Sequence, residues 1–202
     1  MAIQWDGSWP RGRRPTVEGA LERIHRMLTA SYLSVKAVKR DPKAKATYIQ
    51  HFGDGNLVHL NNATNIIRLM HDRVGGDTEV IMMSYVPNLA SFNALGVGPL
   101  PAGTNIEDVE AFVVHIGVDP GTALSVYVCP AFFTGNVYIP NAVNRRTGTG
   151  TILHELSHGV GGTADHAYTW QGNYAGLNAV QRSRNADTYR AYCQSFDNPL
   201  RK

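Results

Sequence analysis

The order of the elements along the chain predicts an α+β protein. Stretches with helical periodicity come first, short stretches rich in β-branched residues occupy the middle, and helical stretches return toward the C-terminus. This order favours helices that are segregated from a sheet rather than alternating with its strands. The chain has 202 residues, which is enough to bury one core, so we expect a single domain over residues 1–202.

The N-terminal part is expected to be helical after a short tail. Residues 1–15 hold two tryptophans and an arginine cluster without apolar periodicity, and we expect them to be a flexible tail. Thr16 is placed to cap the first helix, and Asp41-Pro42 favours the end of that helix and the start of the next. Apolar spacing predicts helices over 17–39, 42–52 and 57–73. Residues 16–74 therefore form a helical part.

The remainder, residues 75–202, is predicted to hold the sheet and the segment that carries the chemistry. Runs of β-branched or apolar residues between turns predict a small, mostly antiparallel sheet with strands over 80–86, 111–118, 124–129 and 137–139. The last run precedes the most informative motif, and we interpret it as an edge strand that binds extended substrate by strand addition. Helices are expected over 151–160 and 175–196, the second of them broken near Ser183.

Composition excludes several classes of protein. Hydrophobic residues make up 43% of the chain and charged residues 17%, which is unlike a disordered chain. No apolar run reaches the roughly 18 residues of a membrane span, and a net charge of +3 is too small and scattered to indicate nucleic-acid binding. We therefore expect neither a membrane nor a nucleic acid as partner, and we expect a monomer.

Compartment is indicated only weakly. Few charges and many Tyr, Gly, Thr and Asn residues favour a secreted or extracellular protein, although residues 1–15 lack the pattern of a Sec signal peptide. A cytoplasmic location is the alternative. Cys129 and Cys193 belong to no CxxC pair, so they form either one disulfide or two buried thiols.

The run His154-Glu155-Leu156-Ser157-His158 predicts a zinc site on a helix. Two histidines four residues apart lie on the same helical face, where both imidazoles can reach one metal ion. Glu155 is offset from that face and is placed to act as a general base on a water molecule whose pKa zinc lowers toward neutrality. The alternative is a buried helix whose histidines are satisfied by hydrogen bonds alone.

Zinc hydrolases need a third protein ligand. No Glu follows Glu155, so a ligand from a later glutamate is excluded. The extended HExxHxxGxxH pattern also fails, because its last position falls on Ala164. Asp165 is the favoured candidate for the third ligand, and His166 is the alternative. Asp187 and Asp197 are less favoured because they lie much farther along the chain from the two histidines.

Further residues carry a family resemblance. The run from Gly162 to Tyr168, GTADHAY, follows the HELSH motif as GTxDxxY follows HExxH in the deuterolysin or aspzincin zinc metalloproteases. Asn185-Ala186-Asp187 resembles a segment of the lysine-specific metallo-endopeptidase branch, and residues 128–133 are similar to the strand segment that precedes the motif there. The resemblance covers about residues 110–197 and implies a zincin-like α+β fold.

The resemblance also implies roles. His154, His158 and Asp165 would bind one Zn²⁺ per chain, Glu155 would be the general base, and Tyr168 would donate its hydroxyl to the developing oxyanion. These roles imply a zinc metalloendopeptidase that acts on proteins or peptides.

Substrate preference is implied by one further carboxylate. Asp187 would lie in the pocket for the residue after the scissile bond (P1′), where a carboxylate favours Lys or Arg. On the residues alone, the alternative is that Asp187 caps a helix, and the pocket is the favoured interpretation. Arg190 stands where fungal lysine-specific members can carry a second acid, and a positive charge there would weaken a preference for lysine. Two alternatives to a general peptidase stay open: a secreted effector or toxin protease with a narrow target, and an inactive zinc- or peptide-binding module.

Overall fold

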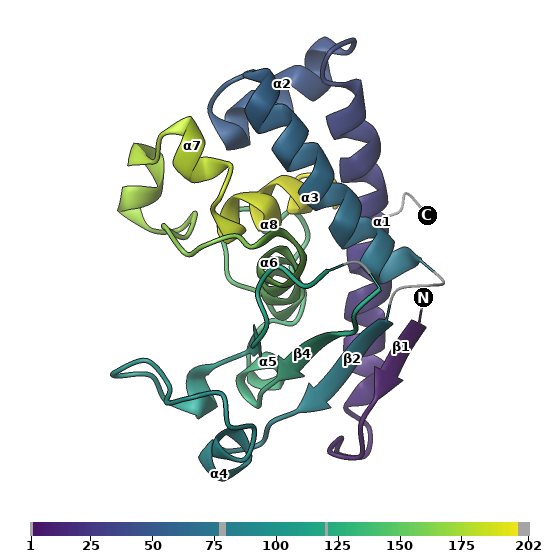
Figure 1. The fold of residues 1–202 in the computed structure, drawn as a ribbon, viewed down its shortest axis with the longest axis vertical. Coiled ribbons are helices and arrows are strands. Elements are labelled where there is room, and N and C mark those ends of the chain that lie inside the picture. The colour runs from purple at the N-terminus through teal and green to yellow at the C-terminus, as the bar shows by residue number, and fades with distance from the viewer. Residues whose placement is uncertain (1, 77–79, 120, 198–202) are drawn as a thin grey trace.

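Three helices lie in the N-terminal part of the protein: α1 (Arg14–Ala37), α2 (Pro42–Phe52) and α3 (Leu57–Gly75). The structure is a computed structural model that describes residues 2–76, 80–119 and 121–197 (Figure 1). Asp41 caps α2 by accepting hydrogen bonds from the backbone N–H groups of Lys43 and Ala44. Helix α1 begins before the expected cap at Thr16, because Pro15 has its φ already set for the first turn.

The segment expected to be a flexible tail is instead structured. Residues Ala2–Trp5 form strand β1, which pairs in parallel with β2 (Val80–Tyr85). Trp9 is buried and donates its indole N–H to the carbonyl of Met83 at 2.8 Å. Its ring packs edge-on against Trp5, with 4.8 Å between the ring centroids. The two tryptophans supply the apolar surface that holds this segment against the sheet.

The sheet has the strand order β1-β2-β4-β3, where β3 is Ala111–Val113 and β4 is Leu124–Val128. The pairings β1–β2 and β2–β4 are parallel, and only β3–β4 is antiparallel. The α+β class is confirmed, but the expectation of a mostly antiparallel sheet is wrong. Helices α1 to α3 separate β1 from β2, and residues 86–123 separate β2 from β4, so both connections are long enough for parallel crossovers.

The edge strand beside the motif helix is β3, not the run 137–139, which is not a strand. The carbonyl of Val137 instead accepts hydrogen bonds from the N–H and hydroxyl of Thr149, at the start of helix α6 (Gly148–Gly161). Strand β3 is shorter than expected, because Gly117 and Val118 donate their N–H groups to carbonyls of α6 rather than extending the strand.

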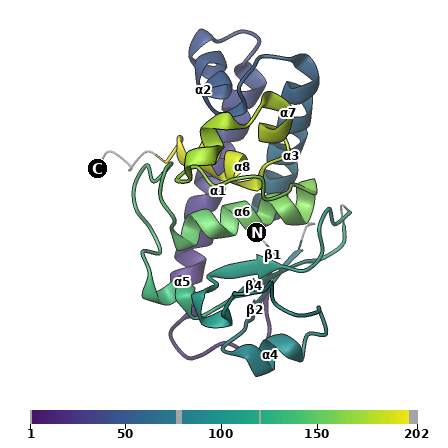
Figure 2. The same cartoon turned by 90° about the vertical axis from the view of Figure 1, so that its left-hand side faces the viewer.

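Helix α6 lies between the sheet and the helical layer formed by α1, α3 and α8 (Figure 2). Gly159 allows the close approach to β4, since a Cβ atom there would lie 2.5 Å from Leu124. The buried side chains of α6, such as Leu153 and Leu156, join the main core. The helix that carries the motif is therefore buried on both sides.

The C-terminal region is helical with a break, as expected. Helices α7 (Ala179–Arg182) and α8 (Ala186–Gln194) flank residues 183–185. Short elements that the sequence did not predict are α4 (Leu89–Asn93), η1 (Ile106–Asp108), α5 (Ala131–Thr134) and η2 (Gly172–Gly176). Cys129 and Cys193 are both buried free thiols, which decides between the two alternatives.

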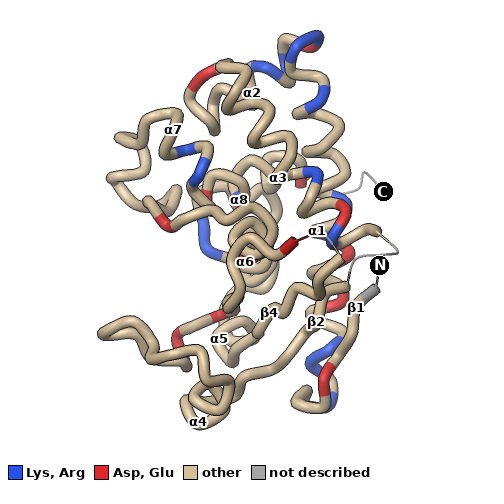
Figure 3. The backbone as a smooth tube through the Cα atoms, in the orientation of Figure 1, with Lys and Arg blue, Asp and Glu red and all other residues tan. Residues whose placement is uncertain are grey.

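Basic residues are concentrated where α1 meets α2 and are otherwise spread along the chain (Figure 3). That junction holds Lys36, Lys39, Arg40, Lys43 and Lys45. Within the described ranges, no helix combines the length and apolar character that crossing a bilayer requires.

Candidate active site

Two histidines of α6 face the same point. His154 and His158 are one helical turn apart, both are buried, and their Nε2 atoms lie 3.0 Å from each other. Thr147 caps the helix by accepting a hydrogen bond from the N–H of Gly150, which fixes where the first turn begins. The spacing predicted from the sequence thus places both imidazoles on one face of a helix.

A carboxylate from the following loop completes a group of three. Gly162 ends α6 in the left-handed region, at φ 59°, and turns the chain back. Asp165 then places its Oδ1 atom 2.9 Å from Nε2 of His154 and 3.3 Å from Nε2 of His158. These separations are close to the edge of about 3.3 Å expected for ligand atoms arranged tetrahedrally around zinc at bonds of about 2 Å. The three side chains therefore fit a zinc ion.

The loop that carries Asp165 is anchored by Asn185, in front of α8. The Asn185 side chain accepts hydrogen bonds from the N–H groups of His166 and Ala167 and donates one to the carbonyl of Ala167. The backbone of Ala164 also forms an isolated parallel bridge with Asn185. Asn185 is fully buried, so this anchor is shielded from water.

Each histidine also has an oxygen on the side away from the metal position. The Nδ1–H of His158 donates to the carbonyl of Thr163 at 2.8 Å, and the Thr163 hydroxyl is hydrogen-bonded to Ser157 at 2.9 Å. For His154 the nearest such oxygen is Oδ1 of Asp187, at 3.8 Å from Nδ1. An oxygen at this position sets the tautomer that leaves Nε2 free for metal. The sequence motif marked Thr163 but did not show this contact.

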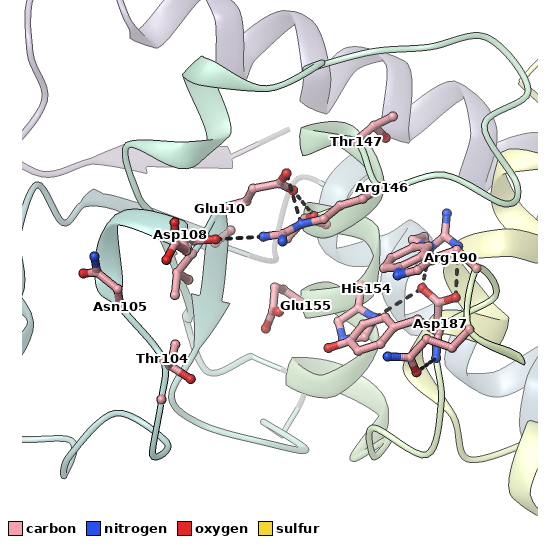
Figure 4. Close-up of a pocket in the computed structure, with 17 residues that line it drawn as sticks. Thr104, Asn105, Asp108, Glu110, Arg146, Thr147, His154, Glu155, Asp187 and Arg190 are labelled. Atoms are coloured by element: carbon pink, nitrogen blue, oxygen red, sulfur yellow. Dashed lines mark hydrogen bonds and ion pairs between the residues drawn. The ribbon is translucent and has the colours of Figure 1, made fainter. Parts of the chain in front are cut away.

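Asp187 is fully buried and forms an ion pair with Arg190. Its Oδ1 accepts from Nε of Arg190 at 2.5 Å, and its Oδ2 accepts from Nη2 at 2.9 Å and from the N–H of Thr169 at 2.5 Å. The residue lies in the first turn of α8 and makes no side-chain cap there. Figure 4 shows Asp187 between Arg190 and His154.

The electrostatics of the group favour a cation at its centre. Burial opposes a charge on His154, but the carboxylates of Asp165 and Asp187 outweigh it and raise the pKa of His154 to about 9. Burial likewise opposes ionisation of Asp165, yet hydrogen bonds from the two histidines hold its pKa well below the ordinary value. The two carboxylates thus favour positive charge at the point that the two histidines face.

Glu155 projects from α6 into a cavity beside the histidines (Figure 4). Its Oε2 accepts a hydrogen bond from the backbone N–H of Val113, on edge strand β3, at 3.0 Å. Burial raises the pKa of this carboxyl, although the neighbouring histidines act in the opposite direction. The cavity has a volume of about 510 Å³ and also borders His154, Tyr168, Trp170 and Asp187.

Tyr168 is held in a stack of aromatic rings. Its ring lies nearly parallel to that of His154, with centroids 5.5 Å apart, and nearly parallel to that of Trp170, with centroids 4.9 Å apart. Burial raises the pKa of the Tyr168 hydroxyl to about 12, so it keeps its proton at neutral pH. Tyr168 and Trp170 both line the cavity.

The residues predicted from the sequence therefore lie together. His154, His158 and Asp165 form one cluster, with Glu155, Tyr168 and Asp187 beside it. His166, the alternative third ligand, is exposed and contributes no atom to that cluster. The contacts that sequence reasoning missed involve backbone atoms, namely the N–H of Val113 and the carbonyl of Thr163.

Helix α6 carries two histidines on one face, packs against a small sheet and borders a cavity that Glu155 enters. This combination is typical of a zinc-dependent peptidase. Residues 103–194 match the aspzincin family model, described as lysine-specific metallo-endopeptidase. This match, over just under half of the chain, confirms the resemblance seen in the motifs and supports a zinc metalloendopeptidase.

The fold agrees with this assignment. A solved zinc peptidase from Grifola frondosa superposes with a TM-score of 0.63 at 15% sequence identity, over 92% of this chain and 96% of that one. At this identity the likeness shows the fold, and it extends to the N-terminal helices that the family model does not cover. A comparison with curated proteins gives no match.

Proposed function

We propose that this metallopeptidase cleaves internal peptide bonds with one zinc ion held by His154, His158 and Asp165. The observation that carries the proposal is the group of three ligand atoms beside a cavity that Glu155 enters. When bound, zinc polarises a carbonyl group and lowers the pKa of water toward neutrality.

The remaining roles fall to side chains of the cavity. Oε2 of Glu155 is held by the N–H of Val113, so Oε1 is the atom we assign to take a proton from the attacking water and pass it to the leaving amine. The Tyr168 hydroxyl donates a hydrogen bond to the oxyanion that develops on the substrate carbonyl. Stacking on both faces of its ring holds that hydroxyl in position. No covalent intermediate with the enzyme is expected.

The substrate is proposed to be a protein or peptide in extended form. Strand β3 is an edge strand, and the cavity wall includes Glu110 and Ala111 at its start. An extended peptide laid along β3 would pass beside Glu155.

The sequence predicts a preference for Lys or Arg after the cleaved bond, and the contacts of Asp187 bear on it in both directions. It is supported by the position of Asp187 in the wall of the cavity and by the resemblance of residues 185–187 to the lysine-specific branch. The ion pair between Asp187 and Arg190 argues against it, because the carboxylate already has a cationic partner. A secreted location is likewise proposed on the composition alone.

The test compares the wild type with Glu155→Gln on a denatured protein mixture, and maps cleavage sites by mass spectrometry. We expect both proteins to bind one zinc ion per chain and only the wild type to cut. Stripping zinc with a chelator should stop cleavage, and adding zinc back should restore it. Cleavage that Glu155→Gln retains would contradict the proposal. Bound zinc without any cleavage would instead favour the narrow-target protease or the inactive binding module.

A further inference from the structure

Arg190 is the most extensively bonded side chain around the cavity. It is 1% exposed and donates to both oxygens of Asp187, to Gln194 and to the hydroxyl of Thr169. It also donates to three backbone carbonyls of the loop before α6, those of Ala142, Val143 and Arg145. A guanidinium held on every side cannot swing away to release its carboxylate.

The carboxylate of Asp187 is saturated by these contacts except toward one side. Three donors occupy it, two from Arg190 and one from the backbone of Thr169. The remaining direction faces His154, whose Nδ1 is 3.8 Å from Oδ1. That Nδ1 atom is buried and has no hydrogen-bond partner among the described residues. A small rotation of either side chain would bring the two atoms into hydrogen-bond distance.

Each of the two histidines therefore has an oxygen acceptor on the Nδ1 side of its ring. Nδ1 of His158 already donates to the Thr163 carbonyl, and Asp187 offers His154 the equivalent acceptor. A carboxylate behind a ligating imidazole fixes its tautomer and orientation and makes it a stronger ligand.

We propose that Arg190 holds Asp187 as a positioning residue behind His154, so that Asp187 is not a contact for a lysine side chain of the substrate. This inference rests on the proposed zinc site. It follows from geometry and charge: Asp187 is fully buried, and a substrate ammonium would meet Arg190 beside it. Two cations would then share one carboxylate, which disfavours a basic residue at P1′.

The guanidinium of Arg190 also lies over the ring of Trp170, 5.0 Å from its centroid. Trp170 in turn stacks on Tyr168. Arg190 thus supports two neighbours of the reaction site, His154 through Asp187 and Tyr168 through Trp170. The part of Trp170 that stays exposed in the cavity wall is apolar and suits an uncharged side chain of the substrate.

The first test measures zinc affinity of the metal-stripped full chain by competition with a chelating dye. We expect Asp187→Asn to weaken zinc binding by about 10- to 100-fold, and Arg190→Lys to weaken it in the same direction. Glu110→Gln is the matched control, because Glu110 is another buried carboxylate of the cavity wall that pairs with an arginine, Arg146, at 3.1 Å. Its zinc affinity should equal that of the wild type. Circular dichroism and thermal melting establish that each variant is folded.

A second readout reports the tautomer of His154. In the zinc-loaded protein, imidazole ¹⁵N shifts should show the His154 proton on Nδ1 and hydrogen-bonded, and Asp187→Asn should change this signal while His158 keeps its own. If Asp187→Asn does not fold, the same comparison made with Arg190→Lys still decides the matter.

The third readout is selectivity, measured on peptides that differ only in Lys or Leu after the scissile bond. We expect the wild type to show no preference for Lys in kcat/KM, and Asp187→Asn to leave the ratio unchanged. A preference for Lys above about tenfold that Asp187→Asn removes, with zinc affinity intact, would overturn the inference. A wild type that binds no zinc would instead refute the proposed function itself.

Discussion

The carboxylate of Glu155 and the backbone N–H of Val113 are joined by a hydrogen bond of 3.0 Å. This contact links α6, which carries the histidines, to β3, the edge of the sheet. Glu155, which we propose as the general base, is thereby fixed relative to the strand along which we propose that the substrate lies. Its reach, and not only its charge, should matter for activity.

Shortening this side chain tests the reach. Glu155→Asp keeps the negative charge but withdraws the carboxylate by one methylene from both Val113 and the substrate. A misplacement of this size should lower kcat by about 100-fold, while zinc content stays at one per chain. Steady-state kinetics on a peptide substrate and metal analysis check both statements. Glu107→Asp, on the short helix η1, is the matched control and should keep full activity. Equal kcat for wild type and Glu155→Asp would count against the assigned role.

Removing one oxygen tests the role of Tyr168. Tyr168→Phe preserves the stack between His154 and Trp170 but lacks the hydroxyl donor. Loss of one oxyanion donor lowers kcat by about 10²- to 10³-fold, and KM and zinc affinity should change little. Tyr174→Phe is the control, because the Tyr174 hydroxyl pairs with Thr188 and does not border the cavity. If both variants turn over at the wild-type rate, Tyr168 is a packing residue.

His51 should make the fold sensitive to mild acid. Burial lowers its pKa from 6.5 to about 4, and Arg182 and Arg190 act in the same direction. The unfolded chain therefore binds a proton at a higher pH than the folded chain. The folded protein therefore has the full stabilisation from neutral His51 above pH 6.5. As the pH falls from 6.5 toward 4, the free energy of unfolding decreases by up to about 3 kcal/mol on account of this residue.

Urea denaturation of the zinc-free protein at pH 7 and pH 5 measures this effect. His51→Gln should be less stable than the wild type at pH 7, because the hydrogen bond to Ser195 at 2.8 Å is altered. Its free energy of unfolding should fall less between the two pH values than that of the wild type. Parallel losses in both proteins would show that His51 is not the group responsible.

Two glycine substitutions should have opposite effects on stability. In Gly159→Ala the new Cβ would lie 2.5 Å from Leu124, so α6 and β4 must separate, which costs about 1–3 kcal/mol. In Gly19→Ala, on α1, nothing lies within 4 Å of the new Cβ. Alanine is the better helix former there by about 1 kcal/mol. Thermal melting of the two variants checks the signs, and equal shifts would contradict the packing described for α6.

The cluster of His154, His158 and Asp165 was predictable because the spacing of these residues is local. Two histidines one turn apart need only a helix, and Asp165 follows after a glycine turn. The position of Val113 was not predictable, because its role depends on a backbone N–H brought in by sheet pairing. Arg190 was visible in the sequence as a charge at a notable position, yet its burial and its bonds to loop 142–145 depend on tertiary packing.

In the fold, too, local features were predictable from the sequence and those that depend on tertiary contacts were not. Helices α2 and α3 were predicted within two residues, whereas α1 and α6 each begin three residues before the expected start. Strand direction was not, because it depends on where long connections return the chain. Strand β1 was missed, since four residues without a partner carry no pattern of their own. The run 137–139 failed as a strand because its backbone bonds to the start of α6.

The anchor at Asn185 has a consequence for how the protein exchanges its metal. His158 and Asp165 are only seven residues apart. A metal ion that bridges them closes a short loop, so it removes little further conformational entropy from the chain. The restriction is supplied beforehand by Asn185 and the bridge at Ala164. The loop is therefore preorganised to hold Asp165 beside the histidines, and we expect zinc to leave and return without the chain unfolding. We expect the protein to stay folded without zinc and to bind the ion reversibly, unlike small domains that fold only when their metal binds.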